Sequence, residues 1–200
     1  MTGWIIVVEW LSRLVLLGLF ILSIWSVTII LERRKFFRSL NMDESLGDLE
    51  NWIKEKDEGK LKQWAQARPQ HFVSGALDCV LGRPSASSAE SAFSFYISQQ
   101  RQKLERGLSV LGTLGSTTPF IGLFGTILGI IVAFGALSTG QIDSQRVMYS
   151  LAEALILTAV GLAVAIPSVI AFNIYSGKIV KFERGLYGLK DLLISHMREK

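Results

Sequence analysis

The most constraining feature of this sequence is a set of three long windows that contain no charged residue. The windows cover residues 14–31, 107–142 and 154–177 and are 18, 36 and 24 residues long. A helix needs about 20 apolar residues to cross the hydrocarbon core of a bilayer, so the windows predict three transmembrane helices. The second window is longer than one crossing requires, and its ends must reach the aqueous phases or form loops.

The composition agrees with a membrane protein. Half of the 200 residues are hydrophobic, only 19% are charged, and the mean hydropathy of +0.37 is high for a soluble domain. Together with the helical patterns outside the windows, this predicts an all-α membrane protein whose three transmembrane helices continue into long cytoplasmic helical extensions.

The basic residues are distributed asymmetrically along the chain. Of the 21 lysines and arginines, 13 lie in residues 32–106 and six lie in residues 178–200. Because segments rich in Lys and Arg stay on the cytoplasmic side, the asymmetry predicts an N-out, C-in topology, and it explains the net charge of +4 without nucleic acid as a partner. A juxtamembrane cluster is expected to set this topology and to contact anionic phospholipids. The cluster consists of Arg33, Arg34, Lys35 and Arg38.

Seven segments follow from these patterns. They are an outer-surface interfacial helix (1–13), transmembrane helix 1 (14–31), a cytoplasmic helical region (32–107), transmembrane helix 2 (108–137), an outer loop (138–146), transmembrane helix 3 (147–177) and a cytoplasmic tail helix (178–200). In the first segment, Glu9 and Arg13 are four residues apart, and we expect them to face water or each other.

The segments outside the predicted spans carry helical signals. Ser87 and Glu90 match a capping box, which predicts a helix that begins there and runs toward the second span. Apolar residues of the tail recur at spacings of three and four, which predicts a buried helical stripe. The stripe consists of Ile179, Phe182, Leu186, Leu189 and Leu193.

Residues typical of enzymes are few. There is one cysteine, Cys79, and the two histidines, His71 and His196, have no partners at metal-ligand spacing. The sequence contains no nucleophile triad, phosphate loop or dinucleotide fingerprint. We therefore predict a protein that is not an enzyme and that binds no metal and no cofactor.

Two prolines lie within the predicted spans. Pro119 and Pro167 are expected to kink the second and third spans, respectively. Beside Pro119, the hydroxyl groups of residues 116–118 either satisfy backbone groups that the proline frees or belong to a local polar cavity.

Two matching faces of small residues surround one threonine each. The second span contributes Gly122, Thr126, Gly129 and Ala133, and the third contributes Ala154, Thr158, Gly161 and Ala165, with the same spacings of four, three and four. Such faces usually allow helices to pack closely, and a threonine in a span often bonds to its own helix. Alternatively, the faces line a cavity whose polar lining is Thr126 and Thr158. Three spans enclose little space, so a conduit would require a ring of identical subunits.

One carboxylate, Glu153, precedes the third uncharged window. It lies five residues before Thr158, about 140° around a helix, so the two side chains do not share one face. Glu153 either stays hydrated at the outer interface or pairs with a base such as Arg146, or it serves an ion pathway. Because no carboxylate lies near the middle of a span, a complete proton relay would need another subunit.

Two segments resemble a known family. LGTLGSTTPFIGLFGTILGI (residues 111–130), followed by SLAEALILTAVGLAVAIPSVIAFN (150–173), closely resembles the signature of the MotA/TolQ/ExbB proton-channel family, above all its ExbB and TolQ branch. Residues 149–151 depart from the pattern, because Tyr-Ser-Leu stands where ExbB and TolQ commonly have Pro-Gly-Ile.

The resemblance implies a homopentameric, multi-pass ring in the bacterial inner membrane, with residues 138–146 in the periplasm. Such a ring surrounds two copies of a single-span ExbD- or TolR-like partner, whose aspartate takes up and releases the proton. Proton flow is thought to rotate the ring, and the work passes to a TonB- or TolA-like protein. By the same resemblance, Thr126 and Thr158 match the family's pore-lining threonines, and Glu153 matches its functional glutamate.

The sequence therefore predicts a proton-channel or stator subunit that converts proton-motive force into mechanical work on a TonB- or TolA-like protein. That work would serve import across the outer membrane or maintenance of the envelope. The alternative is a non-conducting oligomeric scaffold that docks a single-span partner through the small-residue faces. Proton and sodium coupling are both compatible with these residues.

Overall fold

A computed structural model describes residues 3–40, 49, 51–52, 55, 58–69, 71–81, 83–138 and 144–198. These residues form six α-helices and no β-strand, which confirms the all-α prediction for the described part of the chain. The chain divides into two compact units, one made of residues 1–32 and 107–173 and the other of residues 33–106 and 174–200. Helices α1 (Gly3–Ser39) and α7 (Ser144–Arg198) contribute to both units.

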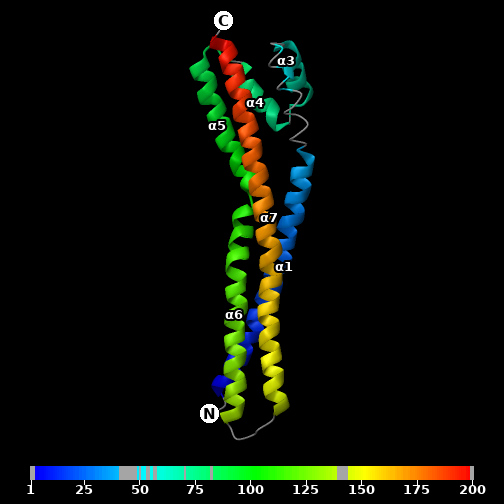
Figure 1. The fold of residues 1–200 in the computed structure, drawn as a ribbon, viewed down its shortest axis with the longest axis vertical. Coiled ribbons are helices and arrows are strands. Elements are labelled where there is room, and N and C mark those ends of the chain that lie inside the picture. Colours follow the sequence, from blue (N-terminus) through cyan, green and yellow to red (C-terminus); the bar gives the residue numbers. More distant parts are fainter. Residues whose placement is uncertain are drawn as a thin grey trace. The chain divides into compact units, whose positions relative to one another are not determined.

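The first unit contains parts of α1 and α7 together with α6 (Leu108–Ser138). By length and composition, all three helices can cross a membrane, as the uncharged windows predicted. Figure 1 shows that α1 begins at the end of this unit where α6 ends and α7 begins. The segment expected to form an interfacial helix is the beginning of the continuous helix α1. Within it, Arg13 Nη2 donates to Glu9 Oε1 at 2.9 Å, so these two charges face each other, as expected.

Helices α6 and α7 pack against each other in antiparallel directions. A Cβ atom added to Gly112, near the start of α6, would meet the ring of Phe172 at 3.3 Å. A Cβ atom added to Gly129, further along α6, would meet Ala154, which lies much earlier in α7. The partners on α7 thus move backward as those on α6 move forward, and the two small-residue faces come together between them.

Helix α1 is joined to this pair by a buried polar contact. The hydroxyl oxygens of Ser26 on α1 and Ser168 on α7 lie 2.7 Å apart and share a hydrogen bond. All three helices also leave large hydrophobic side chains exposed, among them Phe20, Phe120 and Leu155. Exposed apolar surface on a helix that can span a membrane is suited to lipid or to a neighbouring subunit.

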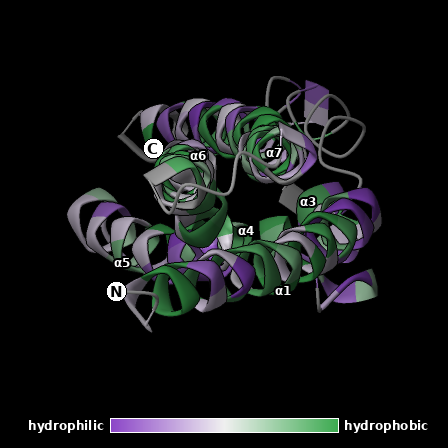
Figure 2. Ribbon diagram, turned by 90° about the horizontal axis from the view of Figure 1, so that it is seen from below, coloured by the Kyte–Doolittle hydropathy of each residue, from purple (hydrophilic) through white to green (hydrophobic). Residues whose placement is uncertain are grey.

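The second unit combines the ends of α1 and α7 with three shorter helices, which are α3 (Glu58–Ala67), α4 (Phe72–Leu81) and α5 (Ala86–Glu105). Aromatic contacts join them: the ring centroid of Phe72 lies 5.0 Å from that of Phe182 and 5.8 Å from that of Tyr96. Figure 2 shows hydrophilic and hydrophobic residues alternating along α5, as expected for a helix that is buried on one side only. The apolar stripe predicted for the tail is buried, which confirms Ile179, Phe182, Leu186, Leu189 and Leu193 as core residues.

The start of α5 differs from the sequence prediction. Its N-cap is Ser85, whose hydroxyl accepts a hydrogen bond from the backbone N–H of Ser88, with an N···O distance of 3.3 Å. The capping box predicted at Ser87 and Glu90 was therefore wrong. Ser85 already supplies the extended backbone and the hydroxyl that an N-cap needs, and Glu90 instead contacts Lys190 at 3.4 Å.

A turn separates α5 from α6. Helix α5 ends at Glu105, and α6 begins at Leu108 after Gly107, whose φ angle is +75°. This left-handed conformation is easy only for glycine. The helix that we expected to run toward the second span therefore stops just before it.

Candidate functional site

The two small-residue faces meet each other within one chain, at a close contact between α6 and α7. A Cβ atom added to Gly122 would lie 2.8 Å from the carbonyl oxygen of Leu157, and one added to Gly161 would lie 2.7 Å from that of Thr118. Only glycine at both positions allows this spacing, because any larger residue would have to push the backbones apart. The remaining small residues of the two faces are buried as well; they are Gly129, Ala133, Ala154 and Ala165.

The hydroxyl groups of Thr126 and Thr158 form a hydrogen bond across this contact. Both hydroxyl oxygens also approach the carbonyl oxygen of Gly122, at 3.1 Å from Thr126 and 3.2 Å from Thr158. Each hydroxyl has one proton but two lone pairs, so the pair keeps acceptor capacity for water or for a protonated carboxyl group. Both side chains are half-buried and therefore partly accessible from outside the chain.

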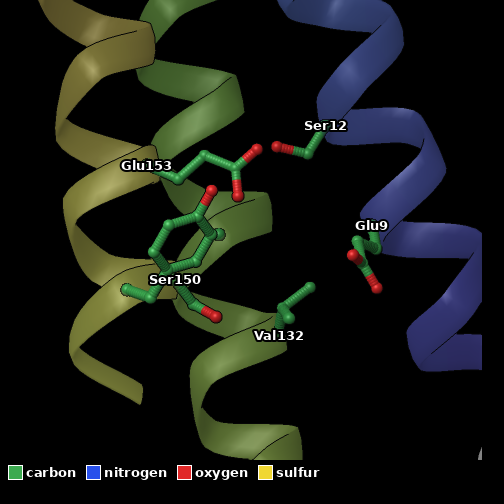
Figure 3. Close-up of a pocket in the computed structure, with 7 residues that line it drawn as sticks. Glu9, Ser12, Val132, Ser150 and Glu153 are labelled. Carbon is green, nitrogen blue, oxygen red and sulfur yellow. The ribbon is translucent and has the colours of Figure 1, made fainter. Parts of the chain in front are cut away.

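Glu153 lines a pocket of about 230 Å³ that neither threonine lines. Residues of α1, α6 and α7 line this pocket; they are Glu9, Ser12, Gly129, Val132, Tyr149, Ser150 and Glu153. Figure 3 shows the hydroxyl of Ser12 pointing from α1 toward the carboxylate of Glu153. Thr158 does not line the pocket, which agrees with the predicted angle between Glu153 and Thr158 around the helix.

Sequence reasoning did not place Glu9 or Ser12 beside Glu153. One signal was present, because Glu9 and Ser12 are three residues apart and so share one face of an otherwise apolar helix. For Arg146, the base considered as a partner of Glu153, the side chain lies outside the described part of the structure. An ion pair between Arg146 and Glu153 therefore stays a prediction.

The hydroxyl groups beside Pro119 bond to their own helix. Those of residues 116–118 donate to the carbonyl oxygens of Thr113 and Leu114. In the described part of α6, none of these hydroxyl groups reaches the carbonyl oxygen of Gly115, four residues before Pro119. That carbonyl lacks its usual backbone donor because proline has no N–H. Pro119 and Pro167 both lie inside their helices, and the kinks expected at them stay predictions.

Arg33 differs from the rest of the juxtamembrane cluster. It is buried, and its Nη1 donates to the carbonyl oxygens of Lys103 and Leu104 at 3.3 and 3.5 Å. These carbonyls belong to the last turn of α5, where a cation is favourable. The other members of the cluster, Arg34, Lys35 and Arg38, are exposed. A lipid-facing role for those three stays a prediction.

Comparison with known proteins identifies the family. The model of the MotA/TolQ/ExbB proton channel family matches residues 65–186, a range that includes Thr126, Glu153 and Thr158. The chain belongs to this family. MotA/TolQ/ExbB proteins are subunits of channels and transport systems rather than enzymes. Glu9 and Ser12 lie outside the matched range.

Individual relatives place the chain in the ExbB/TolQ branch, as the motifs predicted. It is 49% identical to the Tol-Pal system protein TolQ of Pseudomonas aeruginosa over 83 residues, which is 41% of this chain and 36% of that protein. It is 39% identical to the biopolymer transport protein ExbB of Xanthomonas campestris pv. campestris over 109 residues (51% and 42%). It is 35% identical to TolQ of Haemophilus influenzae over 130 residues (64% and 51%). The chain thus covers about half or less of the length of these relatives.

Proposed function

We propose that this chain is the ring-forming subunit of an ion-driven motor in the bacterial inner membrane. Proton-motive force would drive mechanical work on a TonB- or TolA-like protein, for import across the outer membrane or for maintenance of the envelope. The observation that carries the proposal is the hydroxyl pair of Thr126 and Thr158. The pair lies half-buried between two apolar helices, in the part of the chain that matches a proton channel family.

The threonine hydroxyls suit an ion pathway because they can both donate and accept hydrogen bonds. They do not ionise near neutral pH and so cannot carry a charge as a carboxylate does, and their proposed role is to solvate and orient the carrier. The carrier itself is a carboxyl group of another protein, because the described middle portions of the spans contain none. We propose two copies of an ExbD- or TolR-like single-span protein, whose aspartate would exchange hydrogen bonds with Thr126 and Thr158.

The proposed assembly is a homopentamer around that partner. Three spans of one chain cannot enclose a second protein, whereas a ring repeats the threonine pair around its lumen. The exposed hydrophobic side chains of α1, α6 and α7 offer surface for neighbouring subunits as well as for lipid. The proposed topology is N-out and C-in, with residues 32–107 and 178–200 in the cytoplasm and residues 138–146 in the periplasm; the asymmetric distribution of the basic residues supports it.

Glu153 is proposed to act at the outer end of the ion pathway. It lies nine residues after the start of α7, on the end of the first unit where α6 and α7 are connected. A carboxylate there would attract protons or sodium ions before they reach the threonines.

The alternative function is a non-conducting scaffold, and one observation favours it. The small-residue faces around Gly122 and Gly161 already pack against each other within one chain, so the threonine pair could serve only to join α6 to α7. In that case the ring would dock its partner without conducting ions.

Thr158→Val separates these two functions, because valine nearly preserves the volume of threonine and lacks the hydroxyl. The chain and its single-span partner are reconstituted into vesicles, and ion uptake driven by a membrane potential is measured per assembled complex. The channel proposal predicts uptake that is about tenfold slower, or slower still, with assembly unchanged. Uptake at the wild-type rate by a normally assembled Thr158→Val complex would leave only the scaffold.

A further inference from the structure

His71 lies between two elements of the second unit and bonds to both of them. It directly precedes α4, and its Nδ1 atom accepts a hydrogen bond from the backbone N–H of Val73, with an N···N distance of 3.3 Å. Its Nε2 atom lies 3.2 Å from the carbonyl oxygen of Leu40, the residue that follows α1. The imidazole ring thus caps the start of α4 and joins it to the end of α1.

These two bonds determine the protonation state of the His71 ring. A carbonyl oxygen can only accept a hydrogen bond, so Nε2 must carry the proton that it donates to Leu40. A backbone N–H can only donate, so Nδ1 must be without a proton where it faces Val73. The contacts therefore require the neutral ring. A second proton would go to Nδ1 and would point at the N–H group of Val73, where no hydrogen bond can form.

The surroundings of His71 also disfavour a second proton. The ring is half-buried and packs edge to face against the buried ring of Trp64 on α3, with a centroid distance of 5.2 Å. Burial lowers the pKa of His71, the bond to Leu40 acts in the opposite direction, and the charge of Arg68 lowers the pKa further. Among the described residues around the ring, the end of α1 and the start of α4 contribute backbone groups, and the turn after α3 contributes the charge of Arg68.

We propose that Leu40, His71 and Val73 form a pH-sensitive latch in the second unit. Uptake of a proton at Nδ1 turns the ring away from Val73. Because the ring is rigid, Nε2 then leaves Leu40 as well, and the start of α4 is released from the end of α1. The latch stands by itself. Its role rests on the function proposed above: protons that cross the membrane would reach the side on which the second unit lies, open the latch and slow further uptake.

The latch predicts a loss of stability in acid. A histidine in the unfolded chain has a pKa near about 6.5. Because the pKa of His71 is lowered in the folded protein, the latch contributes its full stability above about pH 6.5, and this contribution is lost as the pH falls further. Exchange of the amide hydrogens in the first turn of α4 should then become about fivefold faster, as expected for the loss of an N-cap.

The first measurement is nuclear magnetic resonance of the full-length protein in lipid bilayers, with isotope-labelled histidine. The sequence contains two histidines, so His196→Gln leaves only the signal of His71. The neutral ring should carry its proton on Nε2 and should titrate below about pH 6.5. Arg68→Gln should raise the pH of this titration, whereas Arg83→Gln, beyond the other end of α4, should leave it unchanged. A proton on Nδ1 of the neutral ring, or a titration that Arg68→Gln does not raise, would overturn the latch.

The second measurement is amide hydrogen exchange of α4 at about pH 7.5 and about pH 5.5, on either side of the ordinary pKa of histidine. The rates are corrected for the pH dependence of the exchange reaction itself. His71→Asn is the matched variant, because an asparagine oxygen also caps a helix but does not titrate. Acid should speed the exchange in the wild type and not in His71→Asn. Equal effects of acid on the two proteins would contradict the latch.

Ion uptake by reconstituted vesicles separates the latch from the proposed function. A wild-type complex that takes up no ions, while acid speeds α4 exchange only when His71 is present, would contradict the function and support the latch. A complex that takes up ions, with equal effects of acid on α4 in the wild type and His71→Asn, would support the function and overturn the latch. For the role in feedback, acid on the side of the second unit should slow uptake by the wild type more than by His71→Asn, and equal slowing would exclude that role.

Discussion

Gly161 on α7 and Gly122 on α6 touch backbone to backbone, since a Cβ atom on Gly161 would lie only 3.1 Å from the Cα atom of Gly122. This contact brings Thr126 and Thr158 close enough for their hydroxyl groups to bond. The close packing and the hydroxyl pair are therefore linked, because separating the helices here would break the pair.

Gly161→Ala is expected to lower the free energy of unfolding by about 1–3 kcal/mol, because the added methyl group would lie 2.7 Å from the carbonyl oxygen of Thr118. Denaturant unfolding of the protein in detergent measures this change. Gly18→Ala is the matched control, since nothing lies within 4 Å of a Cβ atom added to Gly18 on α1. Equal stability of Gly161→Ala and the wild type would show that the helices do not approach this closely.

Arg33→Met is expected to cost about 1–3 kcal/mol of stability. It keeps much of the side chain's bulk but removes the charged donor that lies 3.3 and 3.5 Å from the last carbonyl oxygens of α5. Arg34→Met removes the neighbouring exposed charge and should change the stability by less than about 0.5 kcal/mol. Thermal unfolding of both variants gives the comparison, and similar losses in the two would exclude a special role for Arg33.

Ionisation of Tyr96 is expected to lower the free energy of unfolding of the protein at alkaline pH. Burial raises the pKa of Tyr96 to about 12, and its hydroxyl donates to the carbonyl oxygen of Phe72 at 2.9 Å. A tyrosine in the unfolded chain ionises near pH 10, so the stability from this group is complete below about pH 10 and is lost as the pH rises to about 12. Tyr96→Phe should lower the stability by about 1 kcal/mol at neutral pH and should make it less dependent on pH above 10.

Denaturant unfolding at several pH values checks this expectation for Tyr96. Tyr187→Phe, at an exposed tyrosine of α7, is the control and should keep the wild-type pH dependence. A Tyr96→Phe protein that loses stability between pH 10 and pH 12 as steeply as the wild type would contradict it.

The main features of the fold could be predicted because they depend on local properties of the sequence. Charge is absent from three long windows, and the described structure has a helix long and apolar enough to cross a membrane in each of them. Residue size marks where helices can approach, and Gly122 and Gly161 indeed lie at the contact between α6 and α7. The start of α5 could not be assigned correctly, because Ser85, Ser87 and Ser88 offer several similar caps, and the structure has the extended backbone and the accepted hydrogen bond of an N-cap at Ser85.

The pocket beside Glu153 could not be predicted, because it depends on how α1 is placed against α6 and α7. From the sequence, Glu9 is an interfacial charge beside Arg13, and the structure has that ion pair. The same side chain also lines the pocket together with residues of α6 and α7. No spacing of residues in the sequence indicates such a contact between helices. The burial of Arg33 is similar, since it depends on where α5 ends rather than on the basic cluster around Arg33.

Two hydroxyl pairs in the first unit provide the most direct test of the proposed ion pathway. Thr126 and Thr158 join α6 to α7, whereas Ser26 and Ser168 join α1 to α7 with an oxygen–oxygen distance of 2.7 Å. The double variant Thr126→Val/Thr158→Val removes the first pair, and Ser26→Ala/Ser168→Ala removes the second. Both changes replace hydroxyls with apolar groups and leave the glycine contact in place.

The decisive measurement is ion uptake, driven by a membrane potential, into vesicles that contain each variant assembled with its single-span partner. If the threonine hydroxyls line the ion pathway, the threonine variant takes up ions at least about tenfold more slowly per assembled complex, and the serine variant matches the wild type. Wild-type uptake by the assembled threonine variant, or equal losses in the two variants, would contradict a pathway through Thr126 and Thr158.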